Sequence, residues 1–133
     1  MKGYVDNIER ATLENEDFRR VLYTGKNIQL VLMTLPSGCD IGEEVHDDRD
    51  QFFRIEEGEG EIHIDGVANR VEDDFAVIVP AGARHNVVNT GNRPLRLYTI
   101  YGPPEHKDGT VHKDKEAAER DHDNDHWDGE TTE

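Results

Sequence analysis

Short segments of apolar, β-branched and aromatic residues recur over the first three quarters of the chain, and these segments predict β-strands. The segments are residues 19–23, 28–35, 52–55, 61–65, 67–71, 75–79, 86–88 and 95–101. Turn residues separate them, and Asp65-Gly66 predicts a type I′ hairpin turn, because both central positions of that turn need a positive φ. Only residues 7–16 show any helical periodicity in this part. Short strands at regular spacing predict an all-β sandwich or barrel.

Residues 103–133 do not share this pattern. This acidic tail has 11 acidic and 4 basic residues and four of the seven histidines, with very few apolar side chains. Because it offers little apolar surface to offset its chain entropy, we expect it to be mobile or to lie over the body, residues 1–102. Residues 113–120 could form a short helix. Trp127 is the only anchor expected within residues 121–133, so we expect those residues to be dispensable for folding.

The chain has 133 residues and a formal net charge of −15, from 15 basic and 30 acidic side chains. That length fits a single domain with one core. Such a charge argues against nucleic acid or an anionic membrane as a partner, since both are bound through clustered Lys and Arg. The apolar runs are far shorter than the roughly 20 residues of a membrane-spanning helix, and the N-terminus lacks the apolar stretch of a secretory signal. The single cysteine, Cys39, suits a reducing compartment, so we expect a cytoplasmic protein whose ligands are small molecules or metal ions.

Two polar segments interrupt the strands where a closed β-structure would otherwise place apolar residues. In the first, Gly38 is followed after five residues by Glu44-Val45-His46, after four more by Gln51 and after six more by Gly58. The second contains Pro80, Gly82, His85 and Asn89. These spacings resemble the motifs of the cupin superfamily, G-x5-H-x-H-x3,4-E-x6-G and G-x5-P-x-G-x2-H-x3-N, except that Asp74 replaces the leading glycine of the second motif. The resemblance covers about residues 20–101.

The resemblance implies a double-stranded β-helix, a jelly-roll-like barrel with its pocket inside, and a divalent metal ion held by motif residues. Those positions here offer Glu44, His46, Gln51 and His85, whereas similar proteins typically supply three histidines and one glutamate. Period-two geometry puts Glu44 and His46 on one face of a strand, and the approach of Gln51 and His85 is implied by the resemblance alone. Two imidazoles, one carboxylate and one amide oxygen favour Mn or Fe, with Zn or Ni as further options, and a closed structural zinc site is disfavoured.

Several other side chains could take part in chemistry but have simpler interpretations. Alternation along its strand puts His63 on the solvent side. Tyr98 and Tyr101 have opposite parity, so we expect at most one of them to face the pocket. His122 and His126 are four residues apart and could bind a metal on a helix, but a solvated acidic tail explains them more simply.

Small cupins include sugar isomerases and epimerases, ring-opening, lyase-like enzymes of uronate breakdown, and dioxygenases. The resemblance therefore implies a metal-dependent enzyme that acts on a small sugar-like, carbonyl or enediol substrate. The alternative is a non-catalytic small-molecule binder or sensor, with Glu44 and Gln51 as ordinary rim residues. An apolar pocket without a metal favours the binder, whereas a metal with open coordination positions favours the enzyme. The resemblance also implies a homodimer, in which a second chain covers an open part of a sheet.

Overall fold

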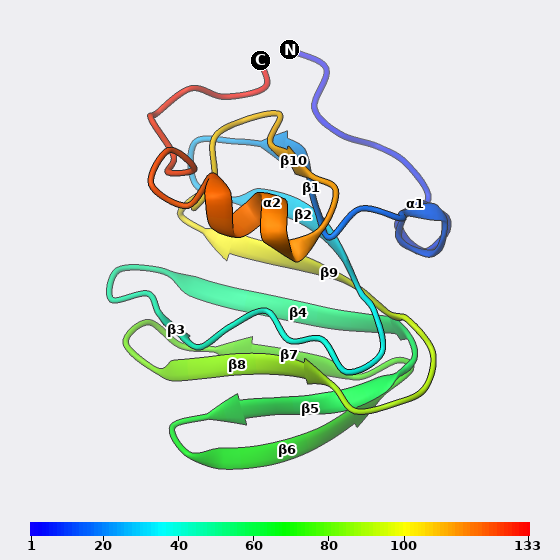
Figure 1. Ribbon diagram of the computed structural model, residues 1–133. Helices are drawn as coiled ribbons and strands as arrows, with labels where there is room; N and C mark the ends of the chain where they lie inside the picture. The colour runs from blue at the N-terminus through cyan, green and yellow to red at the C-terminus, as the bar shows by residue number, and fades with distance from the viewer.

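In a computed structural model of residues 1–133, the chain forms two antiparallel β-sheets that pack face to face (Figure 1). The larger sheet has the strand order β10 (Val111–His112), β1 (Arg19–Thr24), β2 (Gln29–Leu35), β9 (Leu95–Gly102), β4 (Asp50–Glu57) and β7 (Ala76–Val79). The smaller sheet has the order β3 (Glu44–Val45), β8 (Arg84–Asn89), β5 (Glu59–Ile64) and β6 (Val67–Glu72). Consecutive strands such as β4 and β5 belong to different sheets, as in a jelly roll, so the expected all-β barrel fold is confirmed.

The core lies between the two sheets and is built from the inward-facing residues of each strand. On β4 the buried positions are Gln51, Phe53 and Ile55, while Phe52 and Arg54 face outward. The same alternation runs along β9, and one cluster of 16 buried hydrophobic residues joins the two sheets. Burying each large apolar side chain contributes roughly 1.5–3 kcal/mol, which makes this strand register strongly preferred over a one-residue slip.

Two glycine-containing turns explain how the chain moves between neighbouring strands. Asp65 and Gly66 have φ angles of 47° and 83°, and Ile64 pairs with Val67 across them, as the predicted type I′ turn requires. Gly58, between β4 and β5, has a φ of 102°, and a Cβ atom there would lie 2.7 Å from the carbonyl oxygen of Pro94. Any side chain at position 58 would therefore disturb the crossing from one sheet to the other.

Two short helices lie outside the sheets (Figure 1). Helix α1 (Ile8–Glu14) packs against β4 and β9, and the side chain of its N-cap Asn7 accepts a hydrogen bond from the Arg10 amide at 3.0 Å. Helix α2 (Lys115–Arg120) lies within the segment predicted from the sequence and is capped by Asp114. Neither helix is long and apolar enough to cross a membrane.

The acidic tail lies over the body, which is one of the two arrangements expected for it. Strand β10 pairs with β1, and the backbone amide of Trp127 donates to the carbonyl oxygen of Glu105 at 2.9 Å. The expectation that residues 121–133 bury almost nothing apart from Trp127 is wrong, because Asp125 is only 7% exposed. Asp125 is polar and hydrogen-bonds to the buried His106, so a search for apolar surface does not find it.

Candidate metal centre

The fold brings together the four side chains that the sequence proposes as metal ligands. Glu44 on β3 lies opposite His85 on β8, and His46 follows β3 directly. One ligand atom from each of Glu44, His46 and His85 lies within 4.8 Å of the other two. Gln51 reaches the same point from β4 of the other sheet, with its Oε1 3.2 Å from Nε2 of His85. The four residues therefore converge from both sheets on one place inside the barrel.

The hydrogen bonds around His85 and Gln51 turn two lone pairs toward each other. Nδ1 of His85 lies 3.0 Å from the carbonyl oxygen of Ala83, which can only accept, so the neutral ring carries its proton on Nδ1 and leaves Nε2 unprotonated. The Thr99 hydroxyl donates to the carbonyl oxygen of Phe52 at 2.8 Å and therefore accepts from Nε2 of Gln51 at 3.0 Å. This bond holds Oε1 of Gln51 toward His85, and two facing acceptors are stabilised by a cation between them.

Glu44 and His46 form a second close pair with the same property. Nε2 of His46 lies 2.9 Å from Oε2 of Glu44. This buried nitrogen nevertheless has no hydrogen-bond partner, because a hydrogen atom on it would not point at the oxygen. Adjacent nitrogen and oxygen atoms that do not hydrogen-bond to each other are typical of two ligands of one ion. The donor set and the orphaned nitrogen therefore fit a divalent metal ion.

A partner from the acidic tail holds the outer side of His46. Nδ1 of His46 lies 3.5 Å from Oε2 of Glu105, and Nη1 of Arg49 lies 2.5 Å from the same oxygen. Metal-bound histidines usually direct their second ring nitrogen toward such a carboxylate, which fixes the ring and its tautomer. Neither motif contains Glu105, and no local spacing in the sequence points to it.

The charges of these groups stabilise one another before any metal binds. Burial alone would raise the pKa of Glu44, but the neighbouring His46 and the charge of Arg19 outweigh it and lower the pKa. Burial alone would lower the pKa of His46, but Glu44 and Glu105 outweigh it and raise the pKa above its ordinary 6.5. A metal ion must therefore displace a proton from His46 in weakly acidic solution.

A cavity of about 330 Å³ opens beside Glu44 and His46 and gives access to the cluster. The acidic tail supplies much of its wall, namely Glu105, His106, Ala118, His122, Asp125 and His126. Only Val45 and Ala118 among the lining residues are apolar. Between three of the proposed ligands, Glu44, Gln51 and His85, and the rings of Phe53 and Tyr101, the remaining space is too narrow for a water molecule. A ligand in the cavity of about 330 Å³ would therefore meet the cluster at Glu44 and His46.

The family model described as "Cupin domain" matches residues 31–101, more than half of the chain. This chain belongs to the cupin family. It is 52% identical over 124 residues to the protein YrkC of Bacillus subtilis (strain 168), a match that spans 88% of this chain and 66% of the relative. A crystal structure from Bacillus halodurans is 47% identical, with a TM-score of 0.88 over 90% of this cupin and 95% of that chain. A predicted oxalate decarboxylase from Thermotoga maritima is 25% identical, with a TM-score of 0.57 over 59% of this cupin and 69% of that chain.

A chain of buried hydrogen-bonding groups leads from the centre of this cupin into its tail. The hydroxyl of Tyr101 lies 3.3 Å from Nε2 of His106, and Nδ1 of His106 lies 2.7 Å from Oδ2 of Asp125. Because a carboxylate can only accept a hydrogen bond, Nδ1 of His106 donates to Asp125. Nε2 of His106 then accepts a hydrogen bond from the Tyr101 hydroxyl. Burial raises the pKa of Tyr101 and lowers the pKa of His106, so both are neutral at pH 7. Tyr98, of opposite parity, lies on the outer face against Phe52.

The remaining histidines and the cysteine lie outside the cluster. His63 is 42% exposed and contacts Glu61 at 2.9 Å, as expected for the solvent side of its strand. His122 and His126 have ring centroids 5.7 Å apart on a turn after α2, but no third side chain completes a metal site with them. Burial raises the pKa of Cys39, which disfavours a reactive thiolate.

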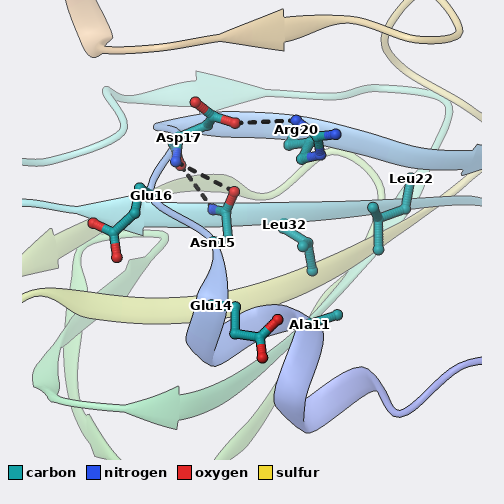
Figure 2. Close-up of a pocket in the computed structure, with 8 residues that line it drawn as sticks. All are labelled: Ala11, Glu14, Asn15, Glu16, Asp17, Arg20, Leu22 and Leu32. Carbon is teal, nitrogen blue, oxygen red and sulfur yellow. Dashed lines mark hydrogen bonds and ion pairs between the residues drawn. The ribbon is translucent and has the colours of Figure 1, made fainter.

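A separate hollow of about 390 Å³ lies between α1 and the outer face of β1 and β2 (Figure 2). Its polar groups are already partnered: the amide of Asn15 donates to the carbonyl oxygen of Asp17 at 2.8 Å, and Arg20 contacts the Asp17 carboxylate at 3.3 Å. None of the candidate metal ligands lines this hollow.

Proposed function

We propose that this cupin binds one divalent metal ion through Glu44, His46, Gln51 and His85 and acts on a small, oxygen-rich substrate in the adjoining cavity. The observation that carries the proposal is the pair of facing lone pairs on His85 and Gln51, each held in place by a hydrogen bond to its far side. A neutral His85 has no proton for its contact with Gln51, and a divalent ion bound to both atoms would remove this mismatch.

The donor set favours manganese or iron over other ions. Two imidazole nitrogens, one carboxylate oxygen and one amide oxygen form a mixed site without sulfur, and zinc and nickel remain further options. Exchanging the usual glutamate and one usual histidine for Gln51 and Glu44 leaves the charge of the four ligands at −1. We therefore expect the metal preference of this site to resemble that of other small cupins.

A divalent ion at this position would polarise a carbonyl or stabilise an enediolate of the substrate. Beside the cluster, the Tyr101 hydroxyl donates a hydrogen bond to Nε2 of His106, and Nδ1 of His106 donates to Asp125, so these three groups hold one another in place next to the candidate metal. The almost wholly polar lining of the cavity favours an enzyme over a non-catalytic binder of apolar molecules. An isomerase, epimerase, lyase or dioxygenase would each use such a set of groups.

The description of the Thermotoga maritima neighbour as a predicted oxalate decarboxylase agrees with a small, polar substrate, although that description belongs to the neighbour alone. The chain spans about two thirds of the length of its relative from Bacillus subtilis, and the proposed activity is that of the matching cupin chain.

Calorimetric titration of the metal-free protein with Mn²⁺ tests the proposal. We expect about one equivalent to bind, and we expect His85→Asn to weaken binding at least a hundredfold, since it removes a direct ligand. His63→Asn is the matched control, because His63 is also a strand histidine paired with a neighbour but lies outside the cluster. Equal affinity in both variants, or no binding to the unaltered protein, would contradict the proposal.

A further inference from the structure

Arg19 is a buried cation whose hydrogen-bonding capacity is mostly unused. It faces inward at the start of β1, and its side chain is only 7% exposed, whereas the side chain of Arg20 points outward. A guanidinium has five N–H donors. Nη1 of Arg19 contacts Nδ1 of His112 at 3.3 Å and Oδ2 of Asp125 at 3.9 Å. Its Nε is buried without a partner, and its Nη2 makes no hydrogen bond within the protein.

The two groups beside Arg19, His112 and Asp125, each have a second partner as well. Oδ2 of Asp125 accepts the hydrogen bond from Nδ1 of His106 at 2.7 Å, which is much shorter than its contact with Arg19. Nε2 of His112 lies 2.9 Å from Asp121, so His112 donates there and offers Arg19 only a lone pair. A buried guanidinium with so few acceptors is costly, which suggests that an acceptor from outside completes its environment.

Arg19 lines the same cavity as Glu44 and His46, so a ligand there can contact it and the metal centre together. Two of the acidic groups on the cavity are neutralised within the protein: Glu105 by Arg49 at 2.5 Å and Glu43 by Arg84 at 2.7 Å. With a divalent ion in place, the positive charges of that ion and of Arg19 exceed the negative charges of Glu44 and Asp125. The loaded cavity would therefore attract an anion.

We propose that Arg19 binds a carboxylate of the substrate, which makes the substrate a small hydroxy or keto acid. This inference rests on the proposed function, because it assigns the carboxylate to a ligand that also reaches the metal. The planar guanidinium fork matches the two oxygens of a carboxylate. A phosphate dianion fits less well, because only one guanidinium is available and the carboxylates of Glu44 and Asp125 would repel the second charge. The volume of about 330 Å³ is at the small end for ligand pockets, in keeping with a short acid.

Binding of lactate and of lactamide to the manganese-loaded protein, measured by calorimetry, tests this inference. The two probes differ in charge but hardly in shape. We expect the unaltered protein to bind lactate at least about tenfold more tightly than lactamide, as a charge-assisted pair of hydrogen bonds should produce. In Arg19→Met this preference should disappear while Mn²⁺ affinity falls by no more than about threefold. Arg19→Lys should keep part of the preference, since it retains the charge but not the fork.

Arg20→Met is the matched control, because Arg20 is the next residue, faces outward and pairs with Asp17 on the surface. The inference is overturned if Arg19→Met and Arg20→Met prefer lactate equally, or if the unaltered protein shows no preference. If circular dichroism shows that Arg19→Met does not fold, the preference for lactate over lactamide is compared between Arg19→Lys and the unaltered protein instead. An equal preference in both overturns the inference. Failure to bind Mn²⁺ would count against the proposed function instead, and the same lactate preference measured without metal would then decide the role of Arg19.

Discussion

The carboxylate of the candidate metal centre is Glu44, and the hydrogen bonds around Gln51 explain why an amide suits position 51. The Thr99 hydroxyl donates to the carbonyl oxygen of Phe52 and can only accept from residue 51. An amide at position 51 supplies the matching N–H, whereas a glutamate would present an oxygen there and force the hydroxyl to turn away from Phe52. The exchange of residue types between positions 44 and 51 is therefore accommodated by the neighbours of Gln51.

A double-mutant cycle on positions 44 and 51 tests whether the two residues share one ion. Glu44→His should weaken Mn²⁺ binding at least about tenfold, because it removes the only anionic ligand. Adding Gln51→Glu restores a ligand set of three histidines and one glutamate and should recover much of that loss. Calorimetry on the unaltered protein, the two single variants and the double variant, each checked to be folded, measures the coupling. If the two changes in Mn²⁺ affinity simply add, or if Glu44→His leaves the affinity unchanged, these residues do not coordinate together.

The raised pKa of His46 sets the pH dependence of metal binding. Burial works against protonation of this ring, but Glu44 and Glu105 hold its pKa above the ordinary 6.5. A protonated imidazole cannot bind a metal, so Mn²⁺ affinity should be constant at alkaline pH and fall as the pH drops through the raised pKa of His46. Titrations between pH 5 and 9 check this, and an affinity that stays flat down to pH 5 would mean that neither histidine is a ligand.

At the level of whole elements, the sequence predicts all eight of the longer strands and misses only the two-residue strands β3 and β10. Those two are too short to show an alternating pattern, and only their partners β8 and β1 define them. The site divides in the same way. Glu44 and His46 follow from local spacing, and Gln51 and His85 follow from the family motifs. Glu105 and Arg19 are placed by contacts between distant segments, which periodicity does not report.

We expect Glu105 to give the tail a measurable role in metal binding. Glu105→Gln removes the charge that orients His46 and should weaken Mn²⁺ binding by about 10–100-fold while leaving the stoichiometry unchanged. Glu57→Gln is a suitable control, because Glu57 also pairs with an arginine, Arg96 at 3.3 Å, but lies away from the cluster. Unchanged affinity in Glu105→Gln would show that the contact between Glu105 and His46 does not support the metal.

Across the whole molecule, the tail is part of both the fold and the cavity wall. It adds β10 to the larger sheet and places α2 beside β10 (Figure 1). Its polar side chains also line much of the cavity. Its composition predicts a segment that is mobile or lies over the body, because it offers little apolar surface to pack. The tail instead buries His106, His112 and Asp125 in one network, and such pairing can be seen only when the segments are brought together.

The stability that Asp125 contributes should depend on pH in a defined direction. Burial alone would raise its pKa, but the hydrogen bond from His106 and the charge of Arg19 hold the pKa below its ordinary 3.8. The stabilisation is therefore fully present above about pH 4 and is lost as the pH falls through the lowered pKa. Asp125→Asn should reduce the free energy of unfolding by about 1–3 kcal/mol at pH 7, with a smaller difference at pH 3. Urea unfolding measures this.

Asp123→Asn serves as the control for that experiment, since Asp123 lies in the same turn but is exposed. A loss of stability at pH 7 that is the same for both variants, or absent from both, would show that Asp125 does not anchor the tail. If the difference in the free energy of unfolding between Asp125→Asn and the unaltered protein is larger at pH 3 than at pH 7, the lowered pKa of Asp125 is contradicted.

The most direct test of the metal centre is an anomalous difference map from crystals grown with Mn²⁺. We predict one strong peak per chain, at roughly 2.0–2.3 Å from the ligand atoms of Glu44, His46, Gln51 and His85, the distance range of nitrogen and oxygen ligands to such ions. A map with no peak at this cluster, or with its only peak between His122 and His126, would contradict the account.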